Sequence, residues 1–368
     1  MKRARKEEPE QWVPPTEGVK YIGSKLRMLP YIVRIVSDLP GIRTVLDGFS
    51  GTTRVSQALY QLGYEVTCND VAVWSEVFGR CYLQADRPQA YYQELIAHLN
   101  ALPPREGWFA RTYGPMPKSP FQYSNLCKLD AVREEITSLR LDTYDESVLL
   151  TSLMLALNNV DSTLGHFSSY LSKWSQRSYR ELFLPLPRLL NFSLPRKQSE
   201  VLRGDVFQAI EGRRFDLAYF DPPYGSNNEK MPPSRVRYAA YYHFWTSVVL
   251  NDHPQVFGRV ARRADTRDLL CSSPFEEYRS DSEGRHLAMK TLSELVARTD
   301  ARYILLSYSS GGRVTKQELL ELLEANGRLL QVLEVDYRKN VMAQMKWTNS
   351  WASADEGHQE YLFLIEKN

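Results

Sequence analysis

Cysteine is scarce in this sequence, and no two cysteines have the spacing of a metal or redox motif. The four that are present, Cys68, Cys81, Cys127 and Cys271, lie far apart in a chain of 368 residues and form no Cys-x-x-Cys pair. Their scatter argues against a zinc site and against a disulfide framework, and it is typical of proteins in a reducing compartment. We therefore expect no bound metal and a cytoplasmic location.

Long apolar runs are missing as well. Residues 1–10 are charged and have no apolar core, and the most apolar helix-like stretch, residues 148–160, is interrupted by hydroxyl and amide side chains. Such segments predict neither a signal peptide nor a membrane span, and we interpret residues 1–18 as a flexible extension. The net charge of +2 is small, so any surface that binds nucleic acid must come from a local group of cations.

The most informative stretch is Asp221-Pro222-Pro223-Tyr224, which follows the apolar run 215–220. That run is typical of a buried parallel strand, so the motif is expected at the carboxyl end of a strand, where ligands bind in open α/β sheets. The prolines donate no N–H to a sheet, so nearby carbonyls can point into a cavity. A carboxylate, a carbonyl and an aromatic ring suit a planar amino group. An ordinary strand that ends in a proline turn would fit the same residues.

A second motif is typical of a nucleotide-binding turn. Residues 44–55 predict a strand, a turn that contains Gly48 and Gly51, and the start of a helix, although the dinucleotide fingerprint Gly-x-Gly-x-x-Gly is absent. The next predicted strand, residues 64–70, ends in Asp70, whose carboxylate could bind two ribose hydroxyls. A βαβ unit that binds no nucleotide is the alternative.

A short loop near the amino terminus is a candidate anion site. Gly23 and Ser24 precede a predicted helix over residues 26–39. The N–H groups of such a loop can approach a carboxylate, and Lys25 adds a positive charge. A plain helix entry would show the same residues.

Together these motifs resemble a known family. The order Tyr-x-Gly-Ser-Lys from Tyr21, Asp-Gly-Phe-Ser-Gly-Thr from Asp47, an acid after the second strand, a long insertion and Asp-Pro-Pro-Tyr resembles the Dam-like class of adenine-specific DNA methyltransferases. The resemblance covers residues 19–80 and 200–250 and strand-like pieces near the carboxyl terminus. It departs from the family at Thr53, where a small residue is common.

The resemblance implies S-adenosylmethionine as the cofactor. By it, two residues line the amino-acid end of the cofactor pocket, three hold the methionine group, and Asp70 binds the ribose hydroxyls. Asp205 takes the position of an acid that recognises the cofactor's adenine. The predicted cofactor-binding residues are Tyr21, Lys25, Asp47, Phe49, Gly51, Asp70, Asp205 and Asp221.

The chemistry of methyl transfer agrees with these residues. Adenine's exocyclic nitrogen is a poor nucleophile because its lone pair is delocalised, and transfer needs it in line with the methyl–sulfur bond. Asp221 and the carbonyl of Pro222 are predicted to accept the two amine hydrogens and to stabilise the positive charge that develops. Within a duplex the base must be extruded, and Tyr224 is predicted to stack on it. Asp221, Pro222 and Tyr224 are thus the predicted catalytic residues.

Two insertions are predicted to contact DNA. The first lies within residues 71–197, and its stretch 161–178 mixes hydroxyls, aromatic rings and spaced cations, as phosphate and groove contacts require. The second, residues 226–279, and a basic loop near residue 338 add further cations. The residues predicted to contact nucleic acid are Thr163, His166, Lys173, Arg177, Arg235, Arg237, Arg338 and Lys339. A solvated face would explain the same charges.

The patterns together predict an α/β fold, a Rossmann-like doubly wound sheet that is mostly parallel and has an antiparallel edge near the carboxyl terminus. A strand is expected over residues 302–308, a helix over 315–326, and the antiparallel pair over 330–337 and 361–366. We assign residues 19–80 and 198–368 to a catalytic domain that binds S-adenosylmethionine, and residues 81–197 to an inserted target-recognition region.

The sequence therefore predicts a site-specific adenine methyltransferase that acts on double-stranded DNA. We expect a bacterial or phage-encoded protein of the cytoplasm that works in restriction-modification or DNA marking, with a restriction endonuclease or defence protein as a candidate partner. Two rivals keep the fold but change the acceptor to cytosine's amino group or to RNA. A binding module without catalysis is a rival of another class, and the intact motif Asp221 to Tyr224 argues against it.

Overall fold

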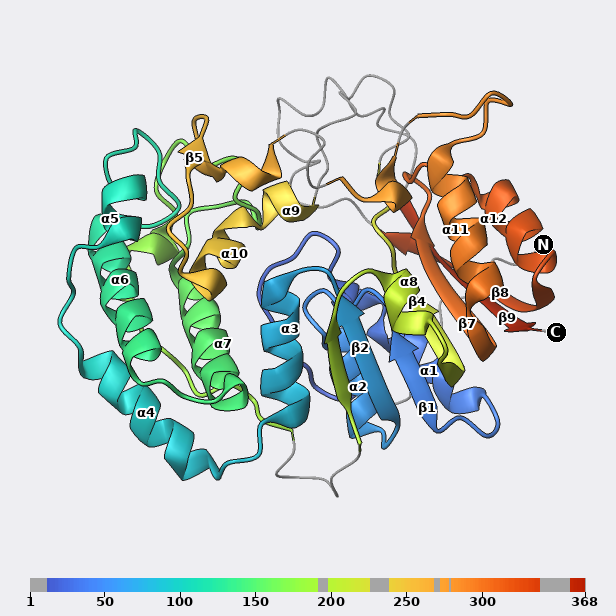
Figure 1. Ribbon diagram of the computed structural model, residues 1–368, viewed down its shortest axis with the longest axis horizontal. Helices are drawn as coiled ribbons and strands as arrows, with labels where there is room; N and C mark the ends of the chain where they lie inside the picture. Colours follow the sequence, from blue (N-terminus) through green and yellow to red (C-terminus); the bar gives the residue numbers. More distant parts are fainter. Residues whose placement is uncertain are drawn as a thin grey trace, which may run out of the picture.

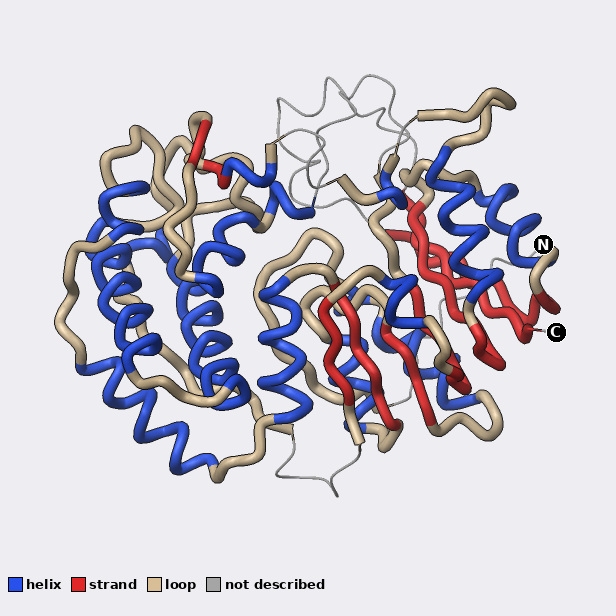
Figure 2. The backbone as a smooth tube through the Cα atoms, viewed as in Figure 1, coloured by secondary structure: helices blue, strands red, loops and turns tan. Residues whose placement is uncertain are grey.

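The computed structural model describes residues 12–190, 198–225, 238–267, 272–277, 279–337 and 358–367. Within these residues a twisted sheet with helices on both faces lies beside a group of longer helices (Figure 1). Figure 2 shows the same division by secondary structure, with the strands of the large sheet gathered on one side and a lobe made mainly of helices on the other.

The sheet contains seven strands in the order β3-β2-β1-β4-β7-β9-β8. The five strands from β3 to β7 run parallel, and β9 is antiparallel to both of its neighbours, β7 and β8. The bounds are β1 Thr44–Asp47, β2 Glu65–Asp70, β3 Glu200–Arg203, β4 Arg214–Phe220, β7 Asp300–Ser309, β8 Gly327–Tyr337 and β9 His358–Lys367. The mostly parallel sheet with an antiparallel edge confirms the fold predicted from the sequence.

Helices cover both faces of this sheet. Apolar side chains of α1 (Leu29–Asp38), α2 (Arg54–Gln61) and α3 (Val73–Gly79) pack in one core on one face. Those of α8 (Val206–Ile210), α11 (Leu287–Arg298) and α12 (Lys316–Glu324) form a second core on the other face. Because β4 alternates between the two cores, with Leu217 in one and Ala218 in the other, the sheet is buried on both sides as a doubly wound fold requires.

Local signals account for some of these boundaries. Thr315 begins α12 with a capping box in which its side chain accepts from the Glu318 N–H and Glu318 reaches back. The helix predicted over 26–39 is present as a 3₁₀ turn, Lys25–Arg27, followed by α1. Thr53, which caps α2, adopts a left-handed φ of 57°. That conformation is costly for a β-branched residue, and it explains why small residues suit this position.

The lobe of longer helices stands beside α3 (Figure 1). Its helices are α4 Gln89–Ala101, α5 Trp108–Tyr113, α6 Tyr123–Ser138 and α7 Thr143–Val160. The five-residue helical turn Arg80–Gln84 follows α3 directly and packs on α7. Asp130 of α6 accepts hydrogen bonds from three backbone N–H groups at the start of α5, at 2.8 to 3.0 Å. This contact fixes two helices of the lobe against each other.

A later segment of the chain packs on the same lobe. It comprises α9 Tyr238–Tyr241, α10 His243–Leu250 and the small antiparallel pair β5 Val256–Phe257 and β6 Arg262–Arg263. Arg133 of α6 donates to the carbonyls of Val248 and Val249 at 2.7 and 2.9 Å, and the fully buried Phe244 packs against rings of the lobe. The lobe is thus built from two stretches of sequence, while the domain limits at residues 81 and 197 stay a prediction.

Two further findings apply to the described part of the chain alone. No helix there is long and apolar enough to cross a bilayer. The same residues hold no group of three or more side chains arranged to bind a metal ion.

Candidate active site

The carboxyl ends of the parallel strands surround a cavity of about 600 Å³, a volume within the range of small-molecule sites. Asp47 ends β1 and Asp70 ends β2, while Asp221 follows the last residue of β4. All eight residues predicted to bind the cofactor line this cavity: Tyr21, Lys25, Asp47, Phe49, Gly51, Asp70, Asp205 and Asp221. The structure therefore brings these eight residues to one place, and their contact with a cofactor stays a prediction.

Hydrogen bonds between loops fix the edge of the cavity. Asp70 accepts from the N–H of Gly51 at 2.8 Å and from that of Ala72 at 2.9 Å. Gly51 has a φ of +48°, and a Cβ there would come within 3.2 Å of the Tyr21 ring, so the turn requires glycine. The amide of Asn69 donates to the carbonyls that follow β1 and β3, at 3.3 and 3.2 Å. These contacts hold three strand ends around the same space.

A buried carboxylate oxygen and a buried amide oxygen at the cavity have no hydrogen-bond partner among the described residues. They are Asp47 Oδ1 and Asn69 Oδ1, and both residues line the cavity. Asp47 Oδ2 is already occupied, since it accepts from the N–H and the hydroxyl of Ser56 at 3.1 and 2.6 Å. A buried acceptor without a partner is costly unless a ligand satisfies it. The residues thus fit a ligand that carries an ammonium group and hydroxyls, as S-adenosylmethionine does.

Aromatic rings form part of the cavity wall. The centroid of the Tyr21 ring lies 5.6 Å from that of Trp74 and 5.5 Å from that of Tyr238, and all three residues line the cavity. Phe49 packs edge to face on Phe275 at 5.1 Å. A flat heterocycle can stack on such surfaces. The sequence analysis missed Trp74 and Phe275, because an aromatic residue after a strand is as common in a core as in a pocket.

Asp205 also lines the cavity, but it takes no part in the hydrogen bonds and ring contacts described above. Its side chain begins the short helix α8 by accepting from the N–H of Phe207 at 2.9 Å. The carboxylate is exposed and keeps acceptor capacity beyond this one bond. Its predicted contact with the adenine of the cofactor is compatible with that position.

The side chains of the Asp-Pro-Pro-Tyr motif meet a lysine and a second acid. Lys25 Nζ lies 3.0 Å from Asp221 Oδ1 and 2.6 Å from the Tyr224 hydroxyl, which itself donates to Asp221 Oδ1. Glu360 of β9 places Oε2 at 3.6 Å from Lys25 Nζ and at 3.4 Å from the Tyr224 hydroxyl. Burial raises the pKa of the Asp221 carboxyl, and the Lys25 ammonium opposes that rise. The sequence analysis missed Glu360.

The contacts of Asp221 leave one of its oxygens for a substrate. Lys25 and Tyr224 both reach Oδ1, so within the described residues Oδ2 has no protein partner. No backbone hydrogen bond of the described chain engages the carbonyl of Pro222. Asp221 lines the cavity, whereas Pro222 is buried and is not among the lining residues. Asp221 Oδ2 is therefore available for one hydrogen of an amino group, and the role of the Pro222 carbonyl stays a prediction.

Contacts through its ring, its carbonyl and its hydroxyl hold Tyr224 in place. Its ring lies 4.8 Å from that of Tyr308 at an interplanar angle of 55°, and its carbonyl accepts from the Arg313 N–H at 2.8 Å. The hydroxyl is engaged with Lys25 and Asp221. Stacking of this ring on an extruded base stays a prediction.

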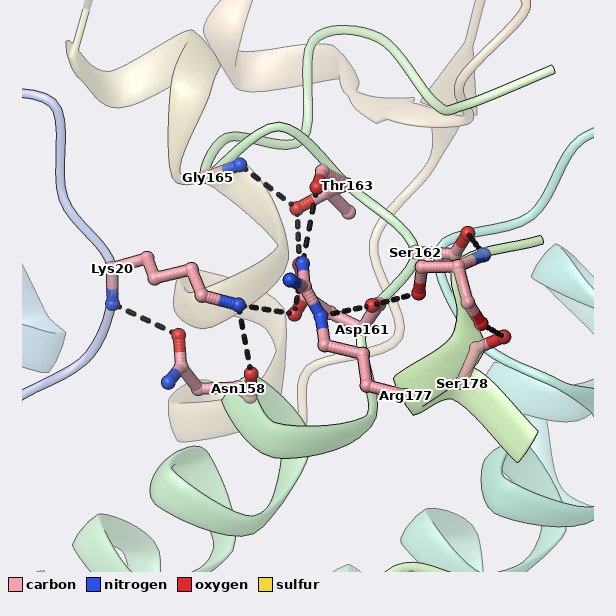
Figure 3. Close-up of polar contacts among 9 residues, drawn as sticks. Lys20, Asn158, Asp161, Ser162, Thr163, Gly165, Arg177 and Ser178 are labelled. Atoms are coloured by element: carbon pink, nitrogen blue, oxygen red, sulfur yellow. Dashed lines mark hydrogen bonds and ion pairs between the residues drawn. The ribbon is translucent and has the colours of Figure 1, made fainter. Parts of the chain in front are cut away.

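Thr163 and Arg177, two residues predicted to contact DNA, converge on Asp161 (Figure 3). Asp161 Oδ1 lies 2.8 Å from Arg177 Nη2 and 3.2 Å from Lys20 Nζ, and Oδ2 accepts from the Thr163 hydroxyl. Arg177 Nε also donates to the Asp161 carbonyl at 2.7 Å. These contacts fix the loop 161–178 and tie it to the segment that carries Tyr21.

The other residues predicted to contact DNA differ in exposure. His166 is 3% exposed and stacks on Tyr241 at 4.7 Å, whereas Lys173 is exposed. For Thr163, His166, Lys173 and Arg177, contact with DNA stays a prediction. The remaining four predicted positions, Arg235, Arg237, Arg338 and Lys339, lie outside the described residues.

The sheet and the acidic cavity define an α/β enzyme with a nucleotide-type ligand site. Residues 21–269 match the model of the D12 class N6 adenine-specific DNA methyltransferases, and this chain belongs to that family. The match confirms the family predicted from the sequence and, with it, S-adenosylmethionine as the methyl donor of this class.

Several modification methylases and type II methyltransferases are similar to the chain. It is 27% identical over 360 residues to the type II methyltransferase M.NlaIII of Neisseria lactamica, a match that covers 95% of this chain and 99% of the relative. It is 26% identical over 372 residues to the modification methylase StsI of Streptococcus sanguinis, which again covers 95% of this chain but only 52% of the relative. The chain thus spans about half of one relative and nearly all of the other.

Similarity to solved structures is low. The rRNA methyltransferase AviRa from Streptomyces viridochromogenes has a TM-score of 0.32 and 11% identity, with 94% of this chain and 86% of that chain covered. A similarity at this level says nothing about activity.

Proposed function

We propose that this chain transfers a methyl group from S-adenosylmethionine to the exocyclic amino group of an adenine in double-stranded DNA. The observation that carries the proposal is the position of Asp221, with a free carboxylate oxygen at the cavity that Asp47 and Asp70 also line. Family membership supports the acceptor. The names of two relatives, a modification methylase and a type II methyltransferase, support a modification role. A restriction endonuclease as partner and the bacterial cytoplasm as location are further parts of this proposal.

The residues of the chain orient the amine and stabilise its charge. Bound S-adenosylmethionine would supply an electrophilic methyl group on a sulfonium. Asp221 Oδ2 and the Pro222 carbonyl accept the two amine hydrogens, which directs the nitrogen lone pair away from the ring plane and lowers the energy of the cationic nitrogen. The Lys25 ammonium, 3.0 Å away in a mostly buried site, favours the ionised form of the Asp221 carboxyl and opposes the rise in its pKa that burial causes. Tyr224, held through its hydroxyl and by Tyr308, offers the ring for stacking.

The experiment is incubation of the purified chain with plasmid DNA and a labelled methyl donor, followed by sequencing that detects modified adenines. Label on N6 of adenine at one recurring sequence is the expected result. Label on cytosine would identify the amino group of that base as the acceptor, and label in RNA alone would replace the DNA substrate. Unmodified nucleic acid under all conditions would refute the proposed activity.

Asp47 gives a prediction about pH. Burial raises the pKa of the Asp47 carboxyl to about 7, with hydrogen bonds from Ser56 opposing the rise and the charges of Asp221 and Asp70 adding to it. If Asp47 binds the ammonium of the methionine group, it must be ionised to do so. S-adenosylhomocysteine carries the same ammonium group, so its affinity for the protein is expected to rise as the pH increases from about 6 towards 7.5. Over this range the ammonium of the ligand itself remains protonated.

Calorimetric titration across this range measures the effect, and Asp47→Asn is the matched variant. The amide carries no charge at any of these pH values, so the variant should bind more weakly and lose the rise on the acid side. A parent affinity that stays flat through the acid range would count against the ionic role of Asp47.

A further inference from the structure

A second carboxylate faces the catalytic motif from the antiparallel edge of the sheet. Glu360 lies on β9, opposite Ser309 of β7, and its side chain is 13% exposed, close to the 12% of Asp221. The Tyr224 hydroxyl stands between the two acids, since it donates to Asp221 Oδ1 and lies 3.4 Å from Glu360 Oε2. An unbroken line of hydrogen-bonding groups thus runs from the motif to β9.

Among the described residues, one lysine lies close to both carboxylates. Lys25 Nζ lies 3.0 Å from Asp221 and 3.6 Å from Glu360, and its own side chain is 8% exposed. Two carboxylates with one ammonium carry a net negative charge in a poorly hydrated site, and one added proton would neutralise the group. The cluster is therefore built to take up a proton.

The proposed reaction releases such a proton. When the amine nitrogen forms its bond to the methyl carbon, the methyl–sulfur bond breaks, and the nitrogen becomes cationic and must lose one hydrogen as H⁺. We propose that Glu360 is the final acceptor of this proton, which reaches it from Asp221 through the hydroxyl of Tyr224. This inference rests on the proposed function.

The transfer balances without another reactant. The N–H bonding electrons stay on the amine nitrogen, and the proton moves to the Asp221 carboxylate. The amine proton arrives on Oδ2, so the Asp221 carboxyl turns about its Cβ–Cγ bond to bring the protonated oxygen to Tyr224, whose hydroxyl turns from Asp221 towards Glu360. Asp221 then passes this proton to the Tyr224 oxygen while Tyr224 gives its hydroxyl proton to Glu360. Asp221 and Tyr224 return to their starting forms, Glu360 is neutral, and exchange with solvent resets it.

The surroundings of Glu360 suit an acceptor. Burial raises the pKa of its carboxyl, the Lys25 ammonium opposes the rise, and the Asp221 charge adds to it. Among the described residues, hydrogen bonds from the Ser309 hydroxyl and from Tyr224 lower the pKa of Glu360, and Tyr219 and Tyr238 also interact with its charge. A carboxylate with a raised pKa is a better proton acceptor near neutral pH than an exposed one.

The test compares Glu360→Gln with the parent in steady-state methylation of plasmid DNA across a range of pH. The kcat of the variant should be about 10- to 100-fold lower than that of the parent. This loss is smaller than the loss of a general base can cause, because the proton can still reach water. The KM values for DNA and S-adenosylmethionine should be nearly unchanged. The fall of kcat on the acid side should move to lower pH, because protonation of Glu360 no longer contributes to it and Asp221 loses a neighbouring negative charge. Glu366→Gln, on the same strand beside Arg328, is the control and should behave as the parent.

A second variant keeps the test decisive if Glu360→Gln folds poorly. Tyr224→Phe keeps the ring and removes the connecting hydroxyl, so it should reduce kcat to a similar extent, and the double variant should be no slower than the worse single one. An acid limb at the same pH in Glu360→Gln as in the parent would show that Glu360 does not take up the proton and would overturn the relay. Parent-like kcat in Tyr224→Phe would do the same. A parent that leaves adenine unmethylated would instead refute the proposed function.

Discussion

Replacing Asp221 with alanine is expected to lower kcat for DNA methylation by about 1,000-fold or more. The variant loses the carboxylate that accepts an amine hydrogen and offsets the cationic nitrogen, an interaction that is strongest in the transition state. Affinity for S-adenosylmethionine should change far less, because Asp47 and Asp70 remain at the same cavity. Lys25 also keeps a counterion in Glu360, so the local fold should survive.

Single-turnover methylation and calorimetric binding of the cofactor measure the two effects separately. Asp221→Asn retains an acceptor oxygen without the charge, so its rate should fall between those of the parent and the alanine variant. Asp216→Asn is the control on the same strand, since Asp216 accepts from the N–H groups of Arg43 and Thr44 at the far end of β4. An alanine variant that methylates DNA as fast as the parent would discard the proposed mechanism.

The sequence predicted the strand ends of the site because their signals are local. Asp47, Asp70 and Asp221 each stand at the end of a predicted strand, and the carboxyl ends of parallel strands meet at one edge of a sheet. The order of motifs along the chain then sufficed to bring eight residues to one cavity. The antiparallel pair at the carboxyl terminus was also predicted, since β8 and β9 contain the expected segments.

Glu360 could not be found in this way. The strand was predicted to begin at residue 361, and β9 begins at His358. Contact with Tyr224 further depends on β9 lying between β7 and β8 and on the register that pairs Glu360 with Ser309. Strand order and register arise from long-range packing, which a local pattern does not contain.

For a related reason, the sequence did not show that the lobe contains a second stretch of the chain. The segment that contains α10 follows the catalytic motif in sequence, so proximity along the chain assigned it to the catalytic domain. In the structure, Phe244 is buried among aromatic rings that include Phe109 and Tyr113. An apolar helix shows that it is buried but not which partner buries it.

Replacing Asp161 with alanine is expected to lower the free energy of unfolding by about 3 kcal/mol and to weaken DNA binding. The carboxylate is 5% exposed and holds Arg177, Lys20 and the Thr163 hydroxyl together (Figure 3). Its loss leaves a partly buried guanidinium without a counterion and frees the loop 161–178. Differential scanning fluorimetry should show a fall in Tm of several degrees, and fluorescence anisotropy with a methylatable duplex should show weaker binding.

The unpaired charge, more than the missing hydrogen bonds, should account for most of this loss. Arg177 makes its closest ionic contact with Asp161 and is only 30% exposed, whereas Lys20 is 43% exposed and more readily hydrated. Adding Arg177→Met to Asp161→Ala should therefore recover part of the stability but none of the DNA binding. Glu294→Ala, which breaks an exposed pair with Arg298, should change the free energy of unfolding by about 0.5 kcal/mol or less. A double variant less stable than Asp161→Ala alone would show that Arg177 stabilises the loop through its backbone contacts, and not through charge.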